Sequence, residues 1–249
     1  MEPLLSVQGL TKSFGGIRAL DGIDVKLEEG EVLGIIGPNG AGKTALINTI
    51  TGFYRADAGH IRFGGEDIGQ LPIHAISRLG IARTFQNIRI FKRLTVLENV
   101  VVAGKWVAMQ PLSALVRLGQ KKPAIEAALE LLAAFGLEGK THWRAASLSY
   151  GEARRLEIAR ALYGAPQVLL LDEPAAGMNE AETERLVNDI RKAQHRLRGV
   201  VLIEHDMSLI RALSTRLIAM DYGRKIAEGT PAAVLAQPNV QQAYLGEAA

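Results

Sequence analysis

Residues 35–48 read IIGPNGAGKTALIN. The apolar run EVLGII, residues 31–36, breaks into a glycine-rich loop, and a helical pattern follows. The loop GPNGAGKT, residues 37–44, fits G-x-x-x-x-G-K-[ST] in full and stands between strand and helix, as that pattern requires. Its glycines let successive backbone N–H groups point at phosphate oxygens, and the helix adds its positive N-terminal end. We therefore predict a phosphate-binding loop formed by Gly37, Pro38, Asn39, Gly40, Ala41, Gly42, Lys43 and Thr44.

Two side chains of this loop carry the predicted chemistry. Lys43 supplies a positive charge for the terminal phosphates, and the Thr44 hydroxyl is suited to coordinate Mg²⁺. The loop alone leaves kinases, GTPases and ATPases open.

A pair of carboxylates follows a second apolar strand. VLLLDEP places Asp172 and Glu173 at the end of this strand. Because ligands bind at the carboxyl ends of parallel strands, Asp172 is expected to reach the Mg²⁺ that Thr44 holds. Glu173 is expected to polarise the water for in-line attack. The alternative for this pair is an acidic turn that ends at Pro174.

The stretch LSYGEARRLEIARAL suggests a second anion site. Ser149 and Glu152 form an S-x-x-E capping box, which by itself indicates only a well-capped helix. Gly151 would let a ligand approach the backbone closely, and a capped helix start with a serine hydroxyl can bind an anion. One nucleotide needs one phosphate loop, so a second phosphate site suggests that another subunit completes the pocket.

Composition limits the classes of protein that fit. The 249 residues have a net charge of +3, too small to argue for nucleic-acid binding, and contain no cysteine, which excludes disulfides and thiol catalysis. We find no signal peptide and no apolar stretch of the roughly 18 residues that a membrane helix needs. If the protein works at a membrane, other chains must supply the spanning part.

The chain predicts an α/β fold with an inserted helical part. Residues 4–34 alternate apolar runs with turns, as strands do, and IARTFQ, residues 81–86, is expected to be a strand that ends at Gln86. TALINTITGFY, residues 44–54, has a helical pattern. From about residue 88 to 162 helical periodicity replaces the strand signals. The apolar runs QVLLLDEP and GVVLIEHD then indicate strands buried on both faces of a parallel sheet.

Taken together, these motifs resemble the ATP-binding-cassette ATPases over essentially the whole chain. LSYGEARRLEIARAL followed by VLLLDEP is similar to the signature and Walker B regions of that family. RTFQ places Gln86 at the family's Q-loop glutamine, which also contacts Mg²⁺, and VLIEHD places His205 at its switch histidine. Phe14, in LTKSFGG, matches the aromatic residue that stacks on adenine. For His205 alone, the alternative is a polar residue at a strand end.

Within that family the chain resembles the LivG-type ATPase subunits of branched-chain or hydrophobic amino-acid importers. The stretches that carry this resemblance are RTFQNIRIFKRLTVLENV, LDEPAAGMN, LIEHDM and the tail AYLGE. The resemblance implies a P-loop (RecA-like) core, an antiparallel β-subdomain and an inserted α-helical subdomain. Applied here, it predicts one domain over residues 1–249 with the helical part at about 88–162.

The resemblance also implies cofactors, partners and a location. ATP and Mg²⁺ are the expected cofactors. Two cassettes, in a homodimer or a heterodimer, would bind head to tail, so that Ser149, Tyr150, Gly151 and Glu152 of one close the phosphate loop of the other. The cassettes would contact integral membrane permease subunits, would serve a substrate-binding protein indirectly and would bind no nucleic acid. They would lie peripherally on the cytoplasmic face of the bacterial plasma membrane.

Four positions depart from the usual family pattern. Tyr150 and Glu152 in S-Y-G-E, and Asn179 after the Walker B strand, are similar to the LivG branch. Ala45 stands where the family usually has a threonine or serine hydroxyl near the α-phosphate. We expect its backbone N–H to keep nucleotide binding, weakened by about one hydrogen bond. Two alternatives remain, the ATPase of a lipopolysaccharide-type exporter and a soluble cassette ATPase outside transport.

Overall fold

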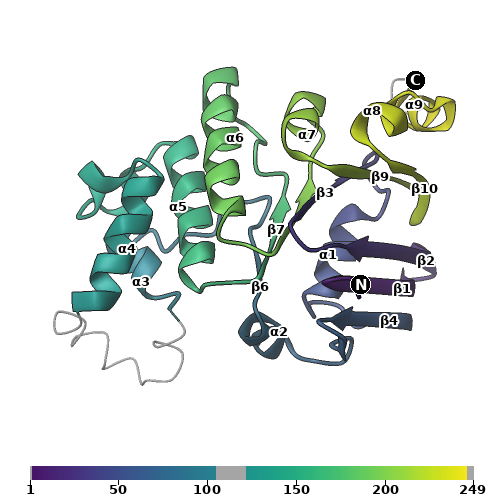
Figure 1. Ribbon diagram of the computed structural model, residues 1–249, viewed down its shortest axis with the longest axis horizontal. Coiled ribbons are helices and arrows are strands. Elements are labelled where there is room, and N and C mark those ends of the chain that lie inside the picture. The colour runs from purple at the N-terminus through teal and green to yellow at the C-terminus, as the bar shows by residue number, and fades with distance from the viewer. Residues whose placement is uncertain (1, 105–121, 246–249) are drawn as a thin grey trace.

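The molecule is built around a parallel sheet whose two faces are both buried (Figure 1). The computed structural model describes residues 2–104 and 122–245. Residues 105–121 of the predicted helical insertion and the end of the AYLGE tail lie outside these ranges. In chain order the elements are β1 (Leu5–Phe14), β2 (Ile17–Leu27), β3 (Glu31–Ile36), α1 (Lys43–Ile50), β4 (Ala58–Phe63), β5 (Glu66–Asp67), α2 (Ile73–Leu79), β6 (Ile81–Arg83), α3 (Val96–Val101), α4 (Lys122–Ala134), α5 (Tyr150–Tyr163), β7 (Val168–Asp172), α6 (Glu180–Gln194), β8 (Gly199–Ile203), α7 (Met207–Leu213), β9 (Arg216–Asp221), β10 (Arg224–Gly229), α8 (Pro231–Leu235) and α9 (Pro238–Leu245).

The larger sheet has the strand order β10-β9-β3-β8-β7-β6, and all neighbours except β9 and β10 run parallel. Successive residues of β7 point to opposite faces: Leu169 and Leu171 pack into one apolar cluster, Val168 and Leu170 into the other. The predicted buried parallel strands are therefore confirmed. In register, Asp172 lies beside Ile203, and Ile35 lies on the other side of Ile203. The segments that follow β3, β8 and β7 consequently leave the sheet at one edge.

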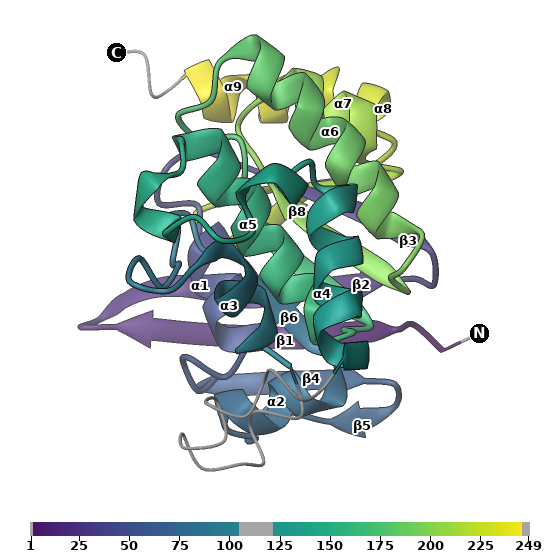
Figure 2. The same cartoon turned by 90° about the vertical axis from the view of Figure 1, so that its left-hand side faces the viewer.

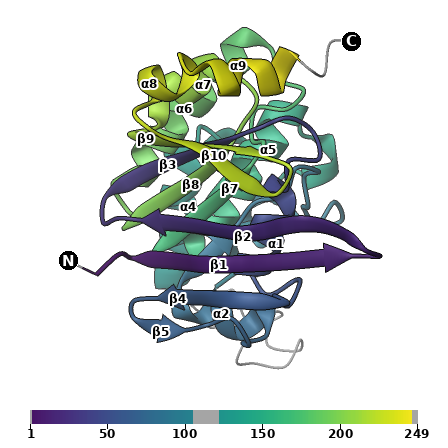
Figure 3. The same cartoon turned by 90° about the vertical axis from the view of Figure 1, so that its right-hand side faces the viewer.

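A second, antiparallel sheet and a group of helices lie on opposite sides of this core. The smaller sheet has the order β2-β1-β4-β5 and faces the viewer in Figure 3. The helices α3, α4 and α5, which lie between β6 and β7 in the chain, gather at the other end and face the viewer in Figure 2. The structure thus confirms the predicted fold class, with an α/β core, an antiparallel β part and helices inserted in the core.

Two predicted elements are shorter than expected. The strand over residues 81–86 ends at Arg83, because the guanidinium of Arg154 binds the carbonyls of Phe85 and Gln86, at 2.6 and 2.7 Å, in place of strand pairing. The helix expected over residues 44–54 ends at Ile50, where Gly52 turns the chain with a left-handed φ of 76°.

Candidate active site

The phosphate loop joins β3 to α1 at the carboxyl edge of the sheet, and its glycines are required by the close approach of other segments. A Cβ atom on Gly37 would lie 2.3 Å from the carbonyl oxygen of Met220, and one on Gly42 would lie 2.4 Å from that of Ala19. Their φ angles are 155° and 99°. The loop is therefore held tightly by β9 and β2 in a conformation that only glycine permits without strain.

The lysine of the loop is buried within it. Lys43 is 6% exposed, and its Nζ donates hydrogen bonds to the carbonyls of Gly37 and Pro38 at 2.5 and 2.8 Å. The Thr44 side chain is exposed at the start of α1. In the remainder of the loop Pro38 and Ala41 are buried, Asn39 and Gly40 are exposed, and Ala45 is partly buried against the apolar cluster that contains Ile47. The loop thus combines an exposed hydroxyl and a helix N-terminus with a positive charge that lies buried against its own carbonyls.

Asp172, the last residue of β7, has a buried oxygen that suits a cation. The residue is 2% exposed, and its Oδ2 accepts a hydrogen bond of 3.3 Å from Arg83. Among the residues that the structure describes, its Oδ1 has no hydrogen-bond partner. Burial raises the pKa of the Asp172 carboxyl, and the charge of Arg83 offsets part of this effect. A buried carboxylate oxygen of this kind fits Mg²⁺, which prefers oxygen ligands.

The described residues offer few further ligands for such an ion. Within residues 2–104 and 122–245 no group of three or more His, Asp or Glu side chains could hold a metal. Mg²⁺ commonly uses one or two carboxylates plus substrate phosphates, so a single aspartate beside a phosphate loop is an adequate protein contribution.

Glu173 lies between the two other side chains that the sequence predicted for catalysis. Its Oε2 accepts a hydrogen bond of 2.7 Å from Nε2 of Gln86, and its Oε1 lies 3.0 Å from Nε2 of His205. Its φ is 47°, which is uncommon for a residue with a side chain. The N–H of Glu173 donates to the carbonyl of Ile203 at 2.9 Å and helps to hold this turn. The structure therefore brings together residues from three separate loops, after β6, β7 and β8.

The residue before His205 was not identified from the sequence. Glu204 is 3% exposed and accepts hydrogen bonds from the N–H groups of Ala175, His205 and Asp206 at 2.7, 3.1 and 3.5 Å. Burial raises its pKa, although these three N–H groups act in the opposite direction. Glu204 thus ties the loop that carries His205 to the segment after Glu173. The signal available in the sequence was a carboxylate at the end of an apolar strand, in VVLIEHD.

The S-Y-G-E stretch begins α5 and lies away from the phosphate loop of its own chain, as the separation of α5 from α1 in Figure 1 shows. The capping box is present: Ser149 Oγ accepts from the N–H of Glu152 at 3.4 Å, and a Glu152 oxygen accepts from the N–H of Ser149 at 3.1 Å. Packing within the chain already explains the glycine at position 151, because a Cβ atom there would lie 2.8 Å from Oε1 of Glu182 on α6. Tyr150 is 44% exposed at the same helix end.

Phe14 lies at the end of β1 and is 40% exposed. Its ring makes an edge-to-face contact with Tyr54, with a centroid separation of 4.8 Å, and the ammonium of Lys12 lies 5.4 Å from the ring centroid. The ring is accessible, and adenine stacking on it stays a prediction.

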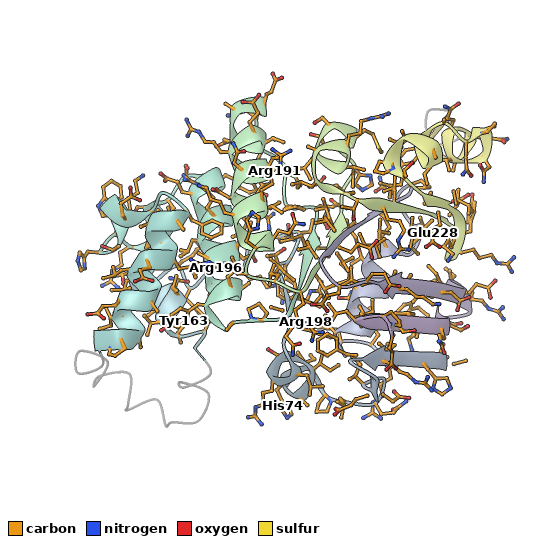
Figure 4. All side chains as sticks on the ribbon, in the orientation of Figure 1. His74, Tyr163, Arg191, Arg196, Arg198 and Glu228 are labelled. Atoms are coloured by element: carbon orange, nitrogen blue, oxygen red, sulfur yellow. The ribbon has the colours of Figure 1, made fainter. Side chains whose placement is uncertain are left out.

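A groove of about 880 Å³ opens between α2 and the C-terminal half of α5. Figure 4 labels His74 on α2, which lines the groove, and Tyr163 at the end of α5, beside Gly164 of its lining. Apolar side chains dominate the lining, and Phe53 and Ile73 are 43% and 45% exposed. Phe85, next to Gln86, also lines it, so the groove adjoins the loop that reaches Glu173.

Two family models match the chain. The model described as ABC transporter matches residues 20–176, and the one described as branched-chain amino acid ATP-binding cassette transporter matches residues 224–249. The chain is 44% identical to the high-affinity branched-chain amino acid transport ATP-binding protein BraF of Pseudomonas aeruginosa and 41% identical to LivG of Escherichia coli K12, over 99% of each chain. It is 36% identical to the lipopolysaccharide export system ATP-binding protein LptB of Escherichia coli K12, over 98% of this chain and 97% of LptB.

Solved structures of similar fold are also ATP-binding cassettes. The ADP conformation of MJ1267, an ATP-binding cassette of an ABC transporter, superimposes with a TM-score of 0.87 at 32% identity, over 99% of this chain and all of that one. A dimeric post-hydrolysis state of the cassette MJ0796, bound to ADP and Pi, gives a TM-score of 0.78 at 25% identity, over 91% of this chain and 98% of that one.

Proposed function

The chain belongs to the ABC transporter family of ATP-binding cassettes and is an ATPase of that family, and from this premise we propose that it powers an importer of branched-chain or other hydrophobic amino acids. The observation that carries the mechanism is Glu173, held between Gln86 and His205 beside the phosphate loop. The identity of 44% to BraF against 36% to LptB, together with the match of residues 224–249, supports amino-acid import over lipopolysaccharide export.

The proposed nucleotide site uses the loop for the phosphates and the outer end of β1 for the base. Backbone N–H groups within residues 39–45 and the Lys43 ammonium bind the phosphates, and Phe14 stacks on adenine. Asp172, Thr44 and Gln86 are the residues that would hold Mg²⁺. When bound, this ion neutralises charge that develops on the phosphate oxygens.

In the proposed hydrolysis step Glu173 orients the attacking water and accepts its proton. The carboxylate is only 15% exposed at its side chain, so it is partly shielded from bulk solvent. His205 lies beside Oε1 of Glu173, and from there it contacts the same water and the terminal phosphate. Gln86 fixes the carboxylate from the remaining side, which leaves Glu173 few other orientations.

We propose one cassette over residues 1–249, with a helical part at about 88–162, that acts as a dimer. Ser149 and Tyr150 lie at the start of α5, away from their own phosphate loop. A second cassette, packed head to tail, would supply these residues to the nucleotide. The sequence of this chain is compatible with a homodimer or a heterodimer.

The groove between α2 and α5 is the proposed contact with the membrane subunits. Its apolar lining with exposed Phe53 and Ile73 fits an amphipathic helix from an integral membrane permease. Arg78 and Arg160 also line it, which favours a helix with acidic residues. Among the described residues no helix is long and apolar enough to span a bilayer. In keeping with the transport relatives, the proposed location is peripheral, on the cytoplasmic face of the plasma membrane, and a substrate-binding protein would deliver the amino acid to the permease.

The variant Glu173→Gln tests the mechanism. It should bind Mg-ATP but lose nearly all hydrolysis, as measured by phosphate release. It should also hold ATP in a stable dimer, as measured by size-exclusion chromatography. The control Glu180→Gln makes the same charge change at an exposed position on α6 and should hydrolyse ATP normally. Full activity of Glu173→Gln would refute the assigned role.

A separate experiment tests the cargo: the chain is purified with the membrane subunits and the binding protein, and amino-acid uptake into vesicles is then measured.

A further inference from the structure

The C-terminal helix reaches the first residue of the phosphate loop. The hydroxyl of Tyr244, on α9, accepts a hydrogen bond of 2.7 Å from the N–H of Gly37. The two residues lie 207 positions apart in the chain. Residues 224–249, which contain α9, match the family model for branched-chain amino acid cassettes, but none of the proposed catalytic roles uses them. The contact links this segment directly to the predicted phosphate loop.

Tyr244 packs against the apolar core, and hydrogen bonds hold its helix to β10 and α8. Its ring packs against the larger apolar cluster, in which the neighbouring Val240 is 2% exposed. Asn239 donates a hydrogen bond of 3.0 Å to the carbonyl of Ile226 on β10, and Gln241 donates one of 3.1 Å to that of Leu235 on α8. Figure 1 shows α9 above β9 and β10, at the side of the sheet where these contacts place it. The hydroxyl is therefore fixed relative to the sheet.

The backbone of Gly37 is also closely packed by Met220 and Ala41. It is buried, and a Cβ atom there would lie 2.3 Å from the carbonyl of Met220 and 3.0 Å from the Cβ of Ala41. A buried N–H that loses its acceptor is costly, so the backbone shifts to find another partner. Any such shift at Gly37 moves the loop whose later N–H groups bind phosphate.

We propose that Tyr244 is a positioning residue for the phosphate loop, which fixes the entrance of the loop through the N–H of Gly37. The C-terminal segment thereby tunes ATP affinity without touching the reacting atoms. This inference rests on the proposed ATP site. It predicts that loss of the hydroxyl weakens nucleotide binding and leaves the rate of the chemical step unchanged.

The test compares Tyr244→Phe with Tyr163→Phe. Tyr163 also uses its hydroxyl in a hydrogen bond, donated to the carbonyl of Ala124 at 2.8 Å, but it lies in the helical part of the protein (Figure 4). We expect Tyr244→Phe to raise the Kd for ATP and the KM by about two- to tenfold, the equivalent of one hydrogen bond, with kcat unchanged. Tyr163→Phe should match the wild type. Amide hydrogen exchange in a peptide spanning Gly37 should also quicken in Tyr244→Phe alone.

The outcomes separate this inference from the function on which it rests. If the wild type binds ATP and Lys43→Ala does not, the site is as proposed. Unchanged or tighter ATP binding by Tyr244→Phe, with unchanged exchange at Gly37, would then overturn the role of Tyr244 alone. A fall in kcat at unchanged KM would overturn it as well. If the wild type itself binds no ATP, the proposed function fails.

Discussion

A fully buried ion pair at the start of α5 offers a quantitative test of how the structure is held together. Arg154 and Glu157 are 0% and 1% exposed at their side chains, and Arg154 Nη1 lies 2.7 Å from Glu157 Oε2. Arg154 also donates to the carbonyls of Phe85 and Gln86, while Glu157 accepts from the N–H of Arg89 at 3.0 Å. The pair therefore joins α5 to the loop that carries Gln86.

Replacing one member leaves the other as an unpaired buried charge. Such a change costs about 3–5 kcal/mol, and we expect this loss of unfolding free energy for Arg154→Met and for Glu157→Gln alike. At about 2–4 °C per kcal/mol for a chain of this size, the midpoint of thermal unfolding should fall by about 6–20 °C. The double variant Arg154→Met/Glu157→Gln removes both charges. It should lose at least about 2 kcal/mol less than the two single losses added together.

These differences are measured by urea unfolding, with circular dichroism as the readout. The matched control is Lys225→Met, which breaks the exposed pair Lys225–Glu228 at the same sequence spacing, with side chains 30% and 34% exposed. That change should cost no more than about 1 kcal/mol. If Arg154→Met costs no more than the control, or if the single losses simply add, the pair is not the energetic unit that its burial implies.

Two further predictions concern the loop and α6. Ala45→Thr restores a hydroxyl near the phosphates and should tighten ATP binding by about 0.5–1.5 kcal/mol, whereas Ala45→Val, of the same shape, should not; equal titrations for both would show that the hydroxyl is irrelevant. Burial raises the pKa of Asp189, so its ionisation lowers stability as pH rises from about 3.9 through the raised pKa. Asp189→Asn should remove this loss, so its advantage in unfolding free energy should grow over that pH range; a pH-independent difference would contradict the pKa shift.

The parts of the site that could be predicted from the sequence are those fixed by local order. The loop at residues 37–44 follows a strand and opens a helix, and the parallel register then places Asp172 and Ile203 at the same sheet edge as Ile35 and Ile36. Knowledge of these strand ends is enough to bring Glu173 and His205 together. The pattern of apolar residues was likewise sufficient for the buried strands.

The contacts that could not be predicted are those in which a polar side chain reaches a distant backbone group. Arg154 binds carbonyls 68 and 69 positions away, and this capture ended β6 at Arg83 rather than at Gln86. Periodicity indicates which face of a helix is buried, but it does not indicate which group a buried charge meets. The capping box at Ser149 was visible, whereas the need for a small residue at Gly151 arises from Glu182 on a different helix.

The position of Glu173 connects these contacts to the chemistry. Its φ of 47° costs of the order of 1–3 kcal/mol, and such a conformation persists only where its surroundings hold it. Gln86 is one of those supports: its side chain binds the Glu173 carboxylate at 2.7 Å, and Arg154 holds its carbonyl at 2.7 Å. The groove beside Phe85 adjoins this loop, so a partner bound there would be linked through Phe85 and Gln86 to Glu173, the proposed catalytic carboxylate. We therefore expect a shift of the Gln86 loop, without rearrangement of the sheet, to release or restrain Glu173.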